Sequence, residues 1–151
     1  MQHSSDFILI IHSLFRWLVL AVLLYAVIRA LLGFTGNKNW TQTDRKTGLF
    51  LMIFADMQLL LGLILYFFTS GKGLKVFQNS DMGTVMKELR YFAVEHPLMM
   101  ILAIVFIHIG KKRSWAASES KIQHKNALIF YGLALIFILS RVPWDHLITW
   151  Y

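Results

Sequence analysis

FILIIHSLFRWLVLAVLLYAVIRALLG, at residues 7–33, is the stretch of sequence that decides the fold of this chain. It exceeds the roughly 20 residues that a helix needs to cross about 30 Å of hydrocarbon. Only Arg16 and Arg29 carry a formal charge within it. No basic region precedes it and no A-x-A cleavage site follows it. We therefore expect it to remain in the mature protein as a membrane span rather than to be removed as a signal peptide.

Three further stretches have a similar length and composition, at residues 49–68, 91–110 and 127–150. Over the whole chain of 151 residues, 57% are hydrophobic and the mean hydropathy is +0.57. Soluble domains contain roughly 45–50% apolar residues, so the composition indicates an integral membrane protein. We expect an all-α, polytopic protein in which residues 1–151 form a single domain. This domain is an antiparallel bundle of four transmembrane helices, with both termini on one side of the membrane.

The connection between the second and third spans contains a helical pattern of its own. Ser80 and Asp81 offer a helix N-cap, and residues 82–94 place apolar side chains at helical spacing. We expect a short amphipathic helix on the outer surface that leads into the third span. Pro97 should kink or restart the helix there, beside His96.

Lysine and arginine are unevenly distributed among the connections. Nine lie in or beside the first and third connections, and four lie in the second. Connections rich in these residues stay in the cytoplasm, so we expect both termini, His12 and His96 to face the outside. The same clustering at connections explains the net charge of +7 without nucleic acid as a partner. The nine residues are Arg29, Lys38, Arg45, Lys46, Lys111, Lys112, Arg113, Lys121 and Lys125.

The histidines of the first and third spans are the candidate cofactor ligands. The chain has no cysteine, so a redox centre has to use histidine, carboxylate or methionine ligands. Odd-numbered spans run parallel, and His12 and His96 lie near the same membrane face. Two imidazoles at similar depth can bind both sides of one iron porphyrin, so we expect one b-type haem per chain. The alternative is that each histidine is simply hydrogen-bonded within the bundle. His108, about 18 Å deeper than His96, cannot serve the same iron.

Four further polar side chains within or beside the spans need an explanation, because polar groups are costly in a bilayer. Arg16 follows His12 by one helical turn, and its depth also permits an ion pair with Asp56. Asp56, with Gln58 nearby, is a candidate proton-handling or quinone-binding group if it is not a structural partner of Arg16. Arg141, near the outer end of the fourth span, can bind haem propionates or extend to lipid headgroups.

Four segments carry a resemblance to a known family. They are HSLFRW at residues 12–17, DMQLLLG at 56–62, VEHPLMM at 94–100 and RVPW at 141–144. The chain resembles, over nearly its whole length, the small four-span bacterial integral-membrane proteins labelled cytochrome-b-like. The resemblance implies a four-helix bundle that binds haem b. The chain lacks the two histidines on each of two helices that respiratory cytochrome b has, so we expect one haem rather than two.

These observations lead to one expected function and two alternatives. We expect a protein of the bacterial inner membrane, with both termini periplasmic, that passes electrons through its haem. Its partners are a quinol, other membrane redox subunits or a second copy of the chain. The first alternative is a haem-free accessory subunit of a larger membrane complex, and the second is a proton-coupled carrier that uses Asp56. No nucleophile triad, phosphate loop or zinc motif suggests a hydrolase.

Overall fold

The computed structural model describes residues 2–69 and 90–142, and this part of the chain is helical without strands. Four long helices are each long and apolar enough to cross a membrane, which confirms the predicted all-α, four-helix fold. Two short π-helical segments adjoin them. The elements are α1 (Gln2–Thr35), α2 (Gln42–Ile64), η1 (Leu65–Thr69), η2 (Tyr91–Glu95), α5 (His96–Ala116) and α6 (Ser120–Ser140).

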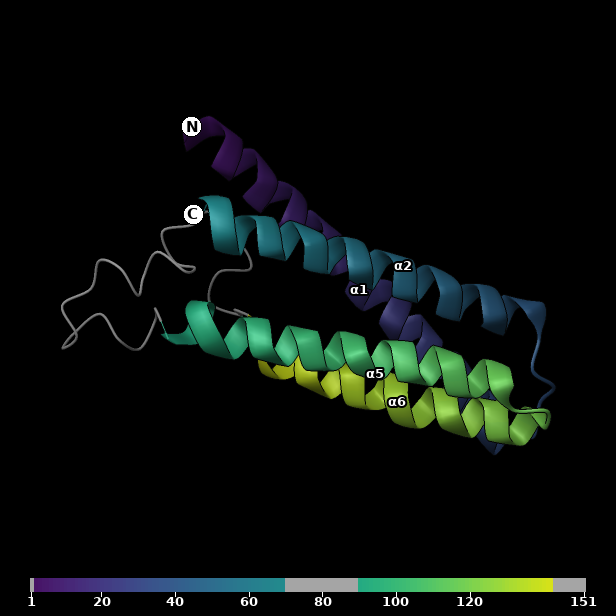
Figure 1. Ribbon diagram of the computed structural model, residues 1–151. Helices are drawn as coiled ribbons and strands as arrows, with labels where there is room; N and C mark the ends of the chain where they lie inside the picture. The colour runs from purple at the N-terminus through teal and green to yellow at the C-terminus, as the bar shows by residue number, and fades with distance from the viewer. Residues whose placement is uncertain (1, 70–89, 143–151) are drawn as a thin grey trace.

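The four long helices form a closed ring of contacts. α1 packs on α2, α2 on α5, α5 on α6, and α6 on α1, so α1 and α5 occupy opposite corners of the bundle. Figure 1 shows that α1 and α5 run in the same direction, and that the connections at residues 36–41 and 117–119 lie at one end. We call this end the loop end. The opposite end holds His12 and His96 and is called the histidine end.

Small residues make up much of the interior. Where the helices touch, the buried side chains are dominated by alanine, which lets backbones approach closely inside a membrane. Between 17% and 28% of each span's most apolar window is buried inside the bundle, so most large apolar side chains are left to face lipid. The alanines of the buried core cluster, which we call the small-residue seam, are Ala26, Ala30, Ala55, Ala103, Ala127 and Ala134.

The fourth span differs in position from its prediction. It was expected at residues 127–150, but α6 runs over Ser120–Ser140. The early start is compatible with a membrane interface because Lys121 and Lys125 are exposed while His124 between them is buried. Residues 143–150 lie outside the described part of the chain.

The predicted amphipathic helix at residues 82–94 also lies mostly outside the described residues. Its last part is described and is helical: Arg90 is followed by the π-helical η2. The N–H of His96 donates to the carbonyl of Tyr91, five residues earlier, and Pro97 lies in the first turn of α5. The backbone stays helical through this point, because Glu95 and His96 both have right-handed helical angles and one helical stretch spans Tyr91–Ala116. The helix changes from π to α beside Pro97 and does not restart there. π-Helical turns of this kind are frequent at functional sites.

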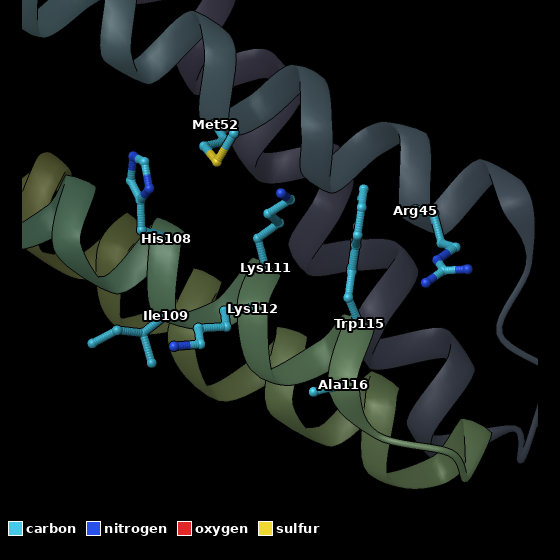
Figure 2. Close-up of a pocket in the computed structure, with 8 residues that line it drawn as sticks. All are labelled: Arg45, Met52, His108, Ile109, Lys111, Lys112, Trp115 and Ala116. Carbon is cyan, nitrogen blue, oxygen red and sulfur yellow. The ribbon is translucent and has the colours of Figure 1, made fainter.

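The loop end contains a groove of about 630 Å³ between α2 and α5. Figure 2 shows side chains from both helices around it, with Arg45 nearest the loops, Lys111 between Trp115 and Met52, and Lys112 beside Ile109. Both helices that line the groove are long and apolar enough to be membrane spans.

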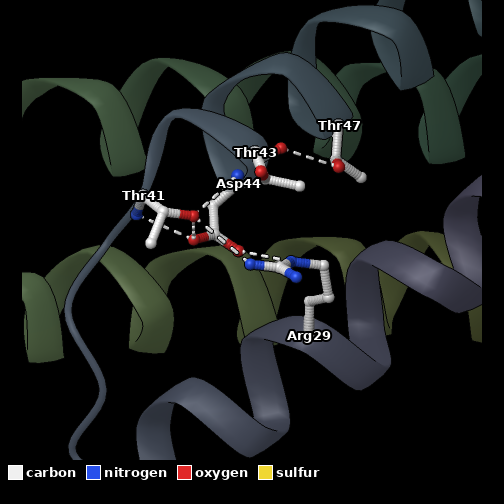
Figure 3. Close-up of polar contacts among 5 residues, drawn as sticks. All are labelled: Arg29, Thr41, Thr43, Asp44 and Thr47. Atoms are coloured by element: carbon white, nitrogen blue, oxygen red, sulfur yellow. Dashed lines mark hydrogen bonds and ion pairs between the residues drawn. The ribbon is translucent and has the colours of Figure 1, made fainter.

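A buried carboxylate joins α1 to the start of α2 (Figure 3). Asp44 accepts from Arg29 Nε at 2.7 Å, and its other oxygen accepts from the backbone N–H and the hydroxyl of Thr41 at 2.8 and 2.6 Å. In return, Thr41 Oγ1 accepts from the backbone N–H of Asp44 at 3.4 Å, which completes a capping box. The network fixes where α2 begins and neutralises a charge that is only 5% exposed.

Candidate functional site

The two predicted ligands lie at the same end of the bundle. His12 is on α1 and His96 is at the first residue of α5, on the opposite corner of the ring, and both are partly buried. The structure therefore brings together two histidines that are 84 positions apart in the sequence.

The ring of His96 is oriented by the chain that follows α6. Its Nδ1 lies 3.0 Å from the carbonyl oxygen of Arg141. A carbonyl can only accept, so Nδ1 carries the proton and the lone pair is on Nε2. The hydroxyl of Tyr91 donates to the same carbonyl at 2.5 Å. An Nδ1–H to carbonyl bond is the arrangement that commonly fixes a metal-binding histidine with Nε2 available.

The ring of His12 is held against α2. Gln58 Nε2 donates to the backbone carbonyl of His12 at 3.0 Å and lies 3.4 Å from the ring Nε2. Gly62, one turn further along α2, leaves room for the ring, because a Cβ there would lie 3.2 Å from His12 Cε1. His12 Nδ1 is buried and has no hydrogen-bond partner among the described residues.

Two arginines accompany the histidines. Arg16 interacts electrostatically with both rings, and its Nε is buried without a partner in the part of the chain that is described. Arg141 Nη2 lies 3.4 Å from Glu95, whose other oxygen accepts from Arg90 Nε at 3.0 Å. The two residues predicted to assist cofactor binding, Arg16 and Arg141, are thus at the histidine end.

Asp56 does not pair with Arg16, and that expectation is wrong. Its Oδ1 lies 2.7 Å from Nε2 of His108 on α5, and both side chains are a little under half exposed. Asp56 and Gln58 are two positions apart on one helix and so point about 200° apart. Gln58 faces His12, whereas Asp56 faces α5, so the structure places the two residues of the predicted proton or quinone site on different sides of α2.

His124 is a bundle residue that the sequence analysis does not single out, because it stands between Lys121 and Lys125. It lies in α6, is 2% exposed, and packs edge-on against Trp40 with ring centroids 4.9 Å apart. Neither ring nitrogen has a partner among the residues that are described. A sequence signal did exist, since the buried positions of α6 are spaced by three and four residues from this histidine onward. These positions are His124, Ala127, Tyr131, Ala134 and Ile138.

The described side chains do not form a complete metal site. In residues 2–69 and 90–142, no group of three or more His, Cys, Asp or Glu side chains could hold a metal ion. Two histidines from opposite helices suit a metal whose other positions are filled by a macrocycle. Comparison of the chain with protein-family models, with curated proteins and with solved structures finds no match in any of the three.

Proposed function

We propose that this protein transfers electrons in the membrane through one b-type haem that is bound by His12 and His96. The observation that carries the proposal is the hydrogen bond from His96 Nδ1 to the Arg141 carbonyl, which leaves Nε2 as the metal-binding nitrogen. Electrons are exchanged with a quinol or with a partner subunit.

The polar atoms of the histidine end fit such a group. Four buried nitrogen and oxygen atoms there have no partner among the described residues: His12 Nδ1, Arg16 Nε, Gln58 Oε1 and Arg141 Nε. Leaving one such atom unpaired costs about 1–3 kcal/mol, so their concentration near two imidazoles supports a polar ligand at this place. A porphyrin has propionate groups that pair well with guanidinium side chains.

Each residue then has a defined task. His12 and His96 would hold the haem iron, and the carbonyl of Arg141, shared with the Tyr91 hydroxyl, keeps the His96 ring in one tautomer. Arg16 and Arg141 supply positive charge for the propionates. The haem, when bound, supplies one-electron redox chemistry. A haem held by two histidines would supply electron transfer rather than oxygen binding.

The electron donor or acceptor reaches the site from the membrane or from a neighbouring protein. Gln58, beside His12, provides an amide for a quinone oxygen, whereas Asp56 lies on another side of α2 and can contribute only indirectly. The exposed apolar faces of the helices suit contact with other membrane redox subunits or with a second copy of the chain.

The membrane and the orientation of the protein in it are inferred from the distribution of basic residues. We infer that the protein lies in a bacterial inner membrane with the loop end in the cytoplasm and both termini periplasmic. The support is the number of basic residues at the loop end, including Arg45, Lys46, Lys111 and Lys112.

Absorption spectroscopy of the purified protein tests the haem proposal. Protein expressed with a haem precursor and purified in mild detergent should show a Soret band and a sharp reduced α-band. Replacing either His12 or His96 with Ala should abolish the low-spin bis-imidazole spectrum. His108→Ala is the matched control, because His108 lies on the same helix as His96 but pairs with Asp56, and it should keep the spectrum.

Two results would contradict the proposal. One is a folded wild-type protein that remains colourless after haem-supplemented expression. The other is a haem spectrum that survives in both the His12→Ala and His96→Ala variants. The first result would favour the haem-free accessory subunit, in which charged pairs such as Arg29 with Asp44 serve helix packing alone. The second would show that the haem has ligands other than these two histidines.

A further inference from the structure

The groove between α2 and α5 at the loop end is independent of the histidine site. Arg45 and Met52 line it from α2, and Ile109 and Trp115 line it from α5. Arg45 lies nearest the loops, Met52 lies further along the spans, and Lys111 lies between them (Figure 2). The lining therefore combines basic and apolar side chains. The groove therefore has the polarity of an amphipathic ligand.

Two cations in the groove share one aromatic ring. The Arg45 guanidinium carbon lies 5.0 Å from the Trp115 ring centroid, and Lys111 Nζ lies 4.2 Å from it. Figure 2 shows the indole edge-on, with Lys111 on one side and Arg45 on the other. Cation–π contacts hold the two charges in place without neutralising them.

The groove also lacks acidic partners. In the described part of the chain, Arg45, Lys111 and Lys112 form no ion pair. Asp56, one turn from Met52 on α2, is engaged by His108. Three positive charges around one groove therefore remain available to an anion from outside the protein.

We propose that this groove binds an anionic phospholipid from the leaflet at the loop end. Arg45, Lys111 and Lys112 contact the headgroup, while an acyl chain lies along Met52 and Ile109. A lipid fits better than a water-soluble phosphate because both walls are membrane spans and the lining includes apolar side chains. Basic pockets between transmembrane helices bind lipid headgroups in this way.

Native mass spectrometry of the purified protein tests the proposal. Protein in detergent is titrated with dioleoyl phosphatidylglycerol and, separately, with dioleoyl phosphatidylcholine. The anionic lipid should bind at one preferred site with at least about tenfold higher affinity, and the double variant Arg45→Gln with Lys111→Gln should lose most of that preference. The matched control, Lys46→Gln with Lys121→Gln, removes two charges from the same end but outside the groove, and it should keep the preference.

A second measurement, tryptophan fluorescence, keeps the basic residues of the groove intact. Phosphatidylglycerol with brominated acyl chains, added to bilayers of phosphatidylcholine, should quench Trp115, and the wild-type protein should therefore lose more fluorescence than Trp115→Phe. The comparison with the variant is needed because the chain has five tryptophans, of which Trp17 is exposed. The proposal is overturned by equal affinity for the two lipids or by an equal loss in the control variant. It is also overturned by inorganic phosphate that displaces the lipid at millimolar concentration, or by quenching that is unchanged in Trp115→Phe.

Discussion

Gly33 and His124 form the closest small-to-large contact described in the bundle. A Cβ built on Gly33 would lie 2.2 to 2.5 Å from three atoms of the His124 ring. The ring is 2% exposed and is packed by Trp40, so it has little room to move away. We expect Gly33→Ala to lower the free energy of unfolding by about 1–3 kcal/mol, the usual cost of overpacking. Unfolding by SDS in mixed micelles, followed by circular dichroism, measures the change.

Gly132 is the matched control for this substitution. It is also a helical glycine, but a Cβ there would meet nothing within 4 Å. Gly132→Ala should leave the free energy of unfolding unchanged or raise it by up to about 1 kcal/mol, because alanine is the better helix former. Equal losses for Gly33→Ala and Gly132→Ala would show that the contact with His124 does not limit the packing of α1 on α6.

For single residues, the sequence predicts the depth of a polar side chain along its helix but not the direction in which that side chain points. His12 and His96 stand out because each interrupts or begins an apolar span, and parallel spans bring them to one end. Their hydrogen bonds depend on helix rotation, which no pattern in the sequence fixed in advance. The pairing of Asp56 with His108 rather than with Arg16 shows the same limit, since depth along the helix was predictable and direction around it was not.

At the scale of the elements, the start of α2 depends on one carboxylate. Asp44→Ala would remove the capping box with Thr41 and leave Arg29 without its ion pair. We expect a loss of about 2–4 kcal/mol in the free energy of unfolding, from the lost cap and the unpaired, partly buried guanidinium. Arg29→Met, alone and combined with Asp44→Ala, completes a double-mutant cycle in the same SDS assay. The double variant should lose less than the two single losses added together, and additive losses would contradict the pairing.

The helix ends were harder to predict than the helices. α6 begins at Ser120 because its early lysines face outward, whereas an average over hydropathy places the start later, where the charges end. The π-helical turns η1 and η2 lie at the histidine end, next to the residues that pack on the two rings. The sequence gives a sign of η2 alone, because Pro97 follows it and has no N–H to donate in a helix.

At the scale of the whole molecule, the orientation in the membrane is directly testable because the chain has no cysteine. Asn39→Cys and Ser118→Cys place single thiols at exposed positions of the loop end, and Ser140→Cys places one at an exposed position of the histidine end. A membrane-impermeant maleimide added to intact spheroplasts should label Ser140→Cys and should label the other two only after permeabilisation. The reverse pattern would contradict the orientation inferred from the basic residues.

The fold class was predictable because four long apolar stretches leave few other solutions in a bilayer. The order in which the four helices contact one another was not predictable, since it depends on which face of each helix has small side chains. The small-residue seam carries those contacts, and the bulky aliphatic side chains outside it are solvated by acyl chains. Leucine, isoleucine, valine and phenylalanine are nearly interchangeable in that setting, so related chains can diverge at most outward positions. The spacing of alanines and glycines along the four helices is therefore a better criterion for recognising this architecture than overall percentage identity.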